Sequence, residues 1–75
     1  NYIKYLQVGL FDQNINLNIL NLDSNKIEIL KNKSFSTLAK LVRLSFRYNS
    51  IIQIESDAFV GLKMLKRLYN ILYKR

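Results

Sequence analysis

The side chains in this chain that could do chemistry are carboxylates, amides and cations, because the sequence contains no histidine and no cysteine. Without those two residue types, the usual zinc ligands, the commonest general base and the standard nucleophilic triads are missing. The only glycines are Gly9 and Gly61, so the sequence has no glycine-rich phosphate loop. We therefore expect no enzymatic activity, no metal site and no cofactor.

The net charge of the chain is strongly positive, with twelve lysines and arginines against five acidic residues and a formal charge of +7. This excess favours acidic partners such as nucleic acid or an anionic membrane. A compositional interpretation competes, because the abundant residues Asn, Ile, Lys, Tyr and Phe share A/T-rich codons. Since 49% of the residues are hydrophobic, we expect a folded chain, and 75 residues suffice for one small domain.

The elements that must position these side chains follow from an internal repeat of 24 residues. The unit reads L-x-x-L-x-L-x-x-N-x-I-x-x-I-x4-F-x-x-L-x-x. This spacing matches neither the period of a helix nor the strict alternation of a strand, so it indicates a coil that bends back on itself. The matched pairs include Leu17 and Leu41, Leu20 and Leu44, Asn25 and Asn49, Ile27 and Ile51, Phe35 and Phe59, and Leu38 and Leu62.

The repeat resembles the leucine-rich repeat family. The phenylalanines at Phe35 and Phe59, preceded by Ser34 and Ala58, resemble the "typical" 24-residue subclass of Toll-type receptors, Slit-like guidance proteins and matrix proteoglycans. The resemblance implies an α/β-type solenoid. Its concave face would carry a short parallel β-sheet, and its convex face would carry irregular, 3-10 or short helical turns.

Each position of the repeat has a physical reason. The strand segment should point Leu20 and Leu22 inward and Ile19 and Asn21 outward, because side chains alternate along a strand. The turn that follows buries backbone groups that need partners. An asparagine amide both donates and accepts, so we expect a structural asparagine ladder, which would consist of Asn1, Asn25 and Asn49.

We interpret residues 1–75 as a single leucine-rich repeat segment without a linker or second domain. Residues 1–16 form a partial repeat, 17–40 and 41–64 form complete repeats, and 65–75 form a partial, irregular one. The irregularity comes from Asn70, which replaces an inward leucine, and from Tyr73, which replaces the ladder asparagine. The first residue is Asn1 rather than Met, and we see no polar caps, signal peptide or spanning segment. We therefore expect a fragment of a longer protein or a processed product.

The C-terminal end also supports a different interpretation. Leu62, Leu65, Leu68 and Leu72 recur at helical spacing, with lysines and arginines between them. A basic amphipathic helix of this kind would bind a membrane surface or a partner's groove.

Stacked coils should expose columns of side chains on the concave face. The columns read Ile19–Arg43–Arg67, Asn21–Ser45–Tyr69 and Asp23–Arg47–Ile71. Neighbouring arginines would repel each other unless an acidic partner lies opposite, and tyrosine is enriched at interface hot spots. The competing interpretation is a solvated face on which Asp23 partly neutralises Arg47. The predicted partner-binding residues are Arg43, Ser45, Arg47, Arg67 and Tyr69.

Three function classes remain. The first is a protein-recognition module of a secreted or receptor ectodomain, of innate-immune or adhesion and guidance type, which binds a protein ligand or co-receptor. The second is polyanion binding, to nucleic acid or a sulfated glycan, through the concave arginines. The third is a purely architectural segment of a solenoid. An extracellular or cell-surface location follows from the subclass resemblance.

Asn32, Lys33 and Ser34 form an N-x-S acceptor for N-glycosylation. The position of Asn32 in the repeat predicts that it is exposed on the convex side. Such tripeptides also arise by chance in an asparagine-rich chain.

Overall fold

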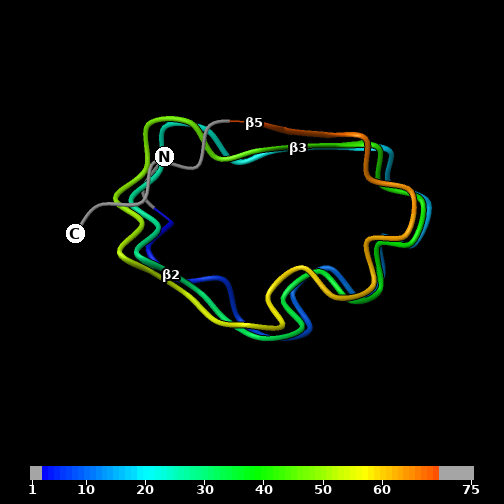
Figure 1. Cartoon of the computed structure of the whole chain (residues 1–75), viewed down its shortest axis with the longest axis horizontal. Helices are drawn as coiled ribbons and strands as arrows, with labels where there is room; N and C mark the ends of the chain where they lie inside the picture. Colours follow the sequence, from blue (N-terminus) through cyan, green and yellow to red (C-terminus); the bar gives the residue numbers. More distant parts are fainter. Residues whose placement is uncertain (1–2, 70–75) are drawn as a thin grey trace.

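A computed structural model of the chain describes residues 3–69, and Figure 1 shows them wound into coils that stack along the line of view. Three strands form a parallel sheet in the order β1 (Ile19–Asn21), β3 (Arg43–Ser45) and β5 (Arg67–Tyr69). Leu20 lies beside Leu44, and Leu44 lies beside Leu68. The 24-residue repeat therefore sets the strand register, and the expected solenoid is confirmed.

The convex side contains a second sheet that the sequence analysis did not predict. Strand β2 (Ile29–Leu30) pairs in parallel with β4 (Gln53–Ile54), and an isolated bridge joins Tyr5 to Ile29. The remaining connections within residues 3–69 are turns and irregular segments, without any helix. The resemblance implied irregular, 3-10 or short helical turns on the convex face, and the described part of the chain shows the irregular turns.

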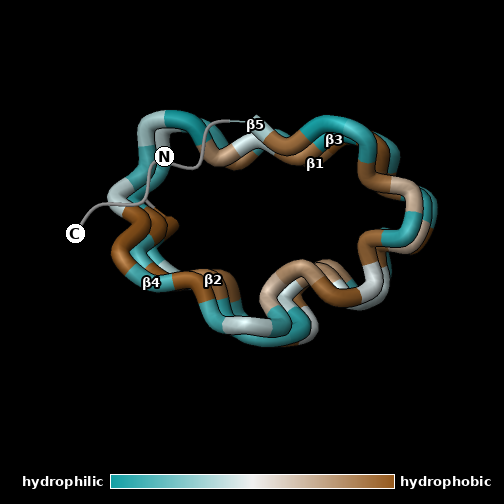
Figure 2. Tube along the Cα trace, in the orientation of Figure 1, coloured by the Kyte–Doolittle hydropathy of each residue, from teal (hydrophilic) through white to brown (hydrophobic). Residues whose placement is uncertain are grey.

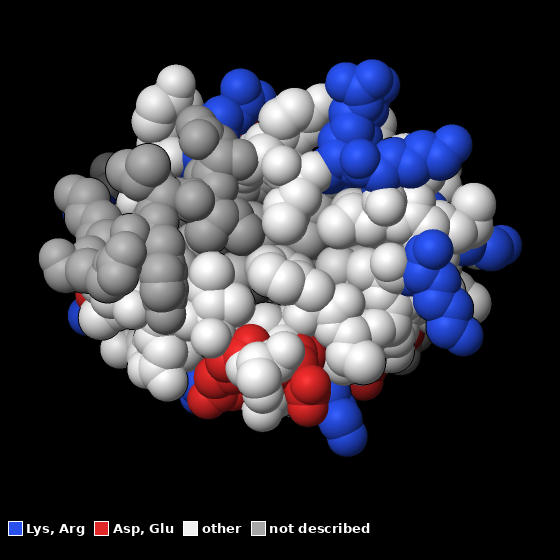
Figure 3. Space-filling view, viewed as in Figure 1, with Lys and Arg blue, Asp and Glu red and all other residues white. Residues whose placement is uncertain are grey.

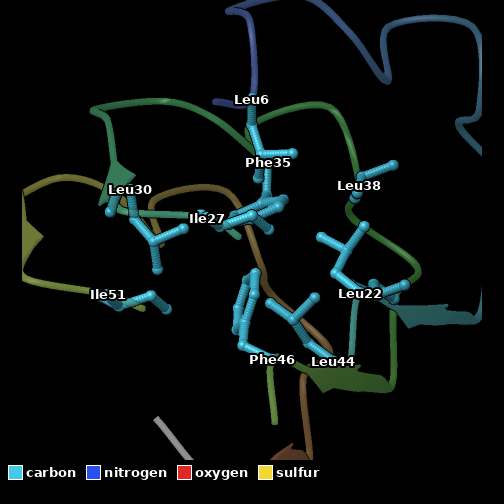
Figure 4. Close-up of a cluster of buried hydrophobic side chains, with 11 residues drawn as sticks. Leu6, Leu22, Ile27, Leu30, Phe35, Leu38, Leu44, Phe46 and Ile51 are labelled. Carbon is cyan, nitrogen blue, oxygen red and sulfur yellow. The ribbon is translucent and has the colours of Figure 1, made fainter. Parts of the chain in front are cut away.

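The core fills the interior of the coils. Figure 2 shows hydrophobic positions recurring at the same places from coil to coil. Phe35 is fully buried, and its ring lies 6.0 Å from the ring of Phe11, 6.2 Å from that of Phe59 and 5.6 Å from that of Phe46. Figure 4 shows Phe35 among the aliphatic side chains that surround it. The buried apolar residues are Leu6, Leu22, Ile27, Leu30, Phe35, Leu38, Leu41, Leu44, Phe46, Ile51 and Ala58.

Asparagine side chains connect successive coils where the chain leaves the sheet. The Asn25 amide donates to the carbonyl of Leu22 at 3.0 Å, and its Oδ1 accepts the N–H of Ile3 at 3.2 Å. Asn49 likewise donates to the carbonyl of Leu22 at 2.9 Å and accepts the N–H of Ile27 at 3.0 Å. These bonds satisfy backbone groups that are buried or partly buried between the coils. Asn1, the third predicted member of the ladder, lies outside the described residues.

The helical interpretation of the C-terminal end is wrong for residues 62–69. Arg67–Tyr69 is strand β5, paired with β3, and residues 62–66 form turns and irregular backbone. Pairing with β3 gives the backbone of this segment hydrogen-bond partners on one side, and Leu65 packs against the core. Asn70, Ile71, Leu72 and Tyr73 lie outside the described residues. Residues 3–69 contain no helix of the length and apolarity needed to cross a membrane.

Candidate recognition surface

The outward surface of β1, β3 and β5, together with Asp23 and Arg47 in the turns that follow β1 and β3, is called the sheet face below. Its first column is Ile19, Arg43 and Arg67, which are Cα partners in the strand register. All three side chains are exposed. Within residues 3–69, neither Arg43 nor Arg67 forms an ion pair or a side-chain hydrogen bond. The column therefore presents two exposed arginines from adjacent strands to solvent.

The second column, Asn21, Ser45 and Tyr69, is less uniform than the sequence predicted. Ser45 is only 6% exposed, and its hydroxyl donates to Asp23 Oδ1 at 2.5 Å. Asn21 is exposed, and its Oδ1 accepts the N–H of Asp23 at 2.9 Å. Tyr69 is half-buried. Ser45 was expected to project outward as a contact residue, but it is buried because its hydroxyl bonds to a carboxylate on the neighbouring coil.

Arg47 is the one sheet-face arginine that has partners in the described chain. Its backbone N–H donates to Asp23 Oδ1 at 2.7 Å. Its Nε lies 3.3 Å from Asp23 Oδ2, an ion-pair distance without the alignment of a hydrogen bond. The guanidinium also lies over the ring of Tyr69, 5.3 Å from the centroid, in a cation–π arrangement. The guanidinium of Arg47 therefore already has two partners within the protein, the carboxylate of Asp23 and the ring of Tyr69.

Asp23 is the acceptor at the centre of this network. Burial raises the pKa of Asp23, but the hydrogen bonds from the Ser45 hydroxyl and the Arg47 backbone, together with the charge of Arg47, outweigh that effect. The pKa of Asp23 therefore lies below its ordinary value. The carboxylate stays ionised at neutral pH and fixes β1 to the end of β3.

A hollow of about 370 Å³ lies on the sheet face. Apolar and aromatic side chains meet amide, hydroxyl and guanidinium groups in it, a mixture typical of binding sites. Its lining brings together four of the five predicted partner-binding residues, and the fifth, Arg67, is the register neighbour of Arg43. The lining residues are Ile19, Asn21, Arg43, Ser45, Arg47 and Tyr69.

Charge is distributed unevenly around the coils. Figure 3 shows lysine and arginine atoms gathered along the top and right, toward the sheet face, and acidic atoms gathered along the bottom. Within residues 3–69, no group of three His, Cys, Asp or Glu side chains comes together in a way that would hold a metal ion.

Asn32 lies on the convex side and is exposed. The side-chain Oδ1 of Asn32 accepts the backbone N–H of Asp57 at 2.7 Å, and the backbone N–H of Asn32 donates to Glu55 Oε1 at 2.7 Å. No described contact occupies its side-chain nitrogen, the atom to which an N-linked glycan would attach. The geometry is therefore compatible with the predicted modification.

The sequence analysis gave the pairing of Asp23 with Arg47 as its competing interpretation, because the two residues occupy the same repeat position in successive coils and carry opposite charges. It missed the hydrogen bond from Ser45 to Asp23 and the position of Arg47 over the Tyr69 ring. The stacking of Arg47 on Tyr69 depends on side-chain conformations, and repeat spacing does not specify these.

The fold and the repeat together define a leucine-rich repeat protein, and comparison with known proteins agrees. The family model described as "Leucine rich repeat" matches residues 15–69. The chain therefore belongs to the leucine-rich repeat family.

Among curated proteins, the chain is similar to two receptors. It is 42% identical over 53 residues to Toll-like receptor 3 of Bos taurus, and these 53 residues make up 71% of this chain and 6% of the receptor. It is 38% identical over 66 residues to leucine-rich repeat-containing G-protein coupled receptor 5 of Rattus norvegicus, and these residues make up 88% of this chain and 7% of that receptor. The chain thus spans only a small part of either relative. No solved structure matches it.

Proposed function

We propose that this chain is a protein-recognition segment of a receptor-type leucine-rich repeat protein and that it binds a protein partner through the sheet face. The hollow carries this proposal. Its lining residues project from β1, β3 and β5 and, for Arg47, from the turn after β3. The register of these strands is fixed by buried Leu44 and its strand neighbours. A preset surface loses little ordering entropy on binding, so such a sheet suits recognition.

Similarity to two proteins named as receptors supports the same proposal. A receptor segment of this kind would act at the cell surface or outside the cell, and it would have no catalytic role. Polyanion binding is the second candidate. It is favoured by Arg43 and Arg67, which are strand neighbours without an ion pair in the described chain, and by the net charge of +7.

Photo-crosslinking from the sheet face, compared with photo-crosslinking from the convex side, tests the proposal. The photoreactive residue benzoylphenylalanine replaces Asn21 on the sheet face or Gln53 on the convex side, both of which are exposed. Each labelled chain is incubated with intact cells of the source organism and irradiated. We expect a discrete protein adduct from position 21 and none from position 53. Adducts from position 53 alone, or equal non-specific labelling from both positions, would refute recognition through the sheet face.

Glycosylation of Asn32 is a further part of the proposal, since it would place the protein in the secretory pathway. The side-chain nitrogen of Asn32 supports it, because the residue is exposed and its bonds to the next coil use other atoms. Peptide mass spectrometry of the protein secreted by its native cells should find a glycan on Asn32. Detection of the unmodified Asn32 peptide alone would contradict the proposed glycosylation.

A further inference from the structure

The three arginines of the sheet face differ in what they have left to bind. Arg47 is paired with Asp23 and stacked on Tyr69. Arg43 and Arg67 are exposed, and within the described chain neither of them forms an ion pair with an acidic side chain. The net positive charge of the sheet face is therefore concentrated in the pair Arg43 and Arg67.

The strand register places these two arginines side by side on the sheet. Arg43 and Arg67 are Cα partners on β3 and β5, and adjacent strands lie about 4.8 Å apart. Like charges at such positions destabilise the sheet. An anion between the two side chains would remove the repulsion and accept charge-assisted hydrogen bonds from both of them. The position beyond Arg43 in the same column is Ile19, which adds no charge.

The hollow beside this pair is suited to an uncharged side chain. Ile19 and Tyr69 give it apolar walls, and the Ser45 hydroxyl is already bonded to Asp23. Arg47 lies over the Tyr69 ring and so restrains that wall. Arg43 both lines the hollow and belongs to the pair, so an anion and a small apolar group can bind side by side.

We propose that the partner is an acidic protein segment, with a carboxylate bound between Arg43 and Arg67 and an adjacent apolar side chain seated in the hollow. This inference rests on the proposed function and specifies its partner. A protein segment fits better than a long polyanion, which needs a run of cationic contacts. On the sheet face that run is interrupted by Ile19 and by the ionised carboxylate of Asp23.

Arginine side-chain NMR tests the proposal on the 75-residue chain with a polar capping repeat fused to each end, because the caps cover the exposed apolar ends of the stack. The Nε–Hε signals of Arg43, Arg47 and Arg67 are followed during titration with a capped Glu-Val-Glu peptide and, separately, with its Gln-Val-Gln counterpart. We expect saturable shifts of the Arg43 and Arg67 signals with the acidic peptide only, and a smaller change at Arg47. Arg43→Gln should weaken peptide binding by more than about fivefold, whereas Lys31→Gln on the convex side should change it less than about twofold.

Two results would overturn the acidic-segment proposal. One is equal shifts, or no shifts, with the two peptides. The other is tighter binding of a heparin hexasaccharide that Lys63→Gln and Lys66→Gln weaken as much as Arg43→Gln, which would assign the surface to a polyanion. Unchanged backbone amide spectra would show that each variant is folded. If the sheet-face crosslinks persist while the acidic peptide fails, only the partner chemistry is wrong; if those crosslinks are also absent, the proposed function fails with it.

Discussion

At the scale of single residues, Asn25 illustrates how one side chain serves two coils. Its amide donates to the carbonyl of Leu22 and accepts the N–H of Ile3, and the residue is 8% exposed. Asn25→Ala leaves the Ile3 N–H without this partner and the Leu22 carbonyl with only its bond from Asn49. We therefore expect the free energy of unfolding to fall by roughly 1–3 kcal/mol. Urea denaturation measures the change. Asn14→Ala, at an exposed position, is the control, and a loss of equal size there would contradict the ladder interpretation.

Asp23 gives the chain a specific pH dependence. Its pKa is lower in the folded protein than in the unfolded chain, so its contribution to stability is present above the ordinary aspartate range, near pH 4, and is lost as the pH falls through the lowered value. Asp23→Asn should reduce stability at pH 7 and reduce the loss of stability below about pH 4. Denaturation curves of both proteins between pH 2 and 7, values chosen to span that range, measure this. Parallel pH profiles would show that Asp23 is not coupled to folding.

At the scale of the elements, one convex turn keeps the same backbone conformation in two successive coils. Gly9 and Lys33 occupy equivalent positions in successive coils, and both have left-handed backbone, with φ of 90° and 61°. A side chain is strained in that region, so Lys33→Gly should raise the free energy of unfolding by up to about 1 kcal/mol. Thermal denaturation measures it. Lys31→Gly, where the backbone is not left-handed, should lower stability; stabilisation by both changes would point to the lost charge instead.

The sequence predicted the elements that depend on spacing and missed those that depend on neighbours. The register of β1, β3 and β5 followed from the repeat, because buried leucines 24 residues apart must stack in one core. Strands β2 and β4 were missed because two residues carry no readable periodicity. Ser45 was misplaced because alternation gives the direction of a side chain but not the hydrogen bond to Asp23 that buries it.

At the scale of the whole molecule, the described coils leave apolar side chains uncovered at both ends of the stack. Leu68 of β5 is 44% exposed, whereas its register partner Leu44 is fully buried. Tyr5, near the start of the described chain, is 50% exposed. Repeat proteins gain stability from the contacts between neighbouring repeats, and their terminal repeats need polar outer faces. We therefore expect the 75-residue chain alone to be marginally stable and prone to aggregation.

Calorimetry tests this expectation. The isolated chain should melt broadly or irreversibly below about 65 °C, the upper end of the usual mesophile range. Fusion of a polar capping repeat to each end should raise the Tm, since the caps cover side chains such as Leu68 and Tyr5. A sharp, reversible transition of the uncapped chain above that temperature would show that its two ends cost less stability than we infer.

The most direct test of recognition through the sheet face compares two charge-matched double variants. Arg43→Gln with Arg67→Gln removes two charges from the sheet face, and Lys31→Gln with Lys33→Gln removes two from the convex side. Binding of each fluorescently labelled chain to intact cells of the source organism is measured by flow cytometry. We predict that the arginine variant binds more than about tenfold more weakly and the lysine variant less than about twofold more weakly than the parent. Equal losses, or a larger loss from the lysine variant, would contradict recognition through the sheet face.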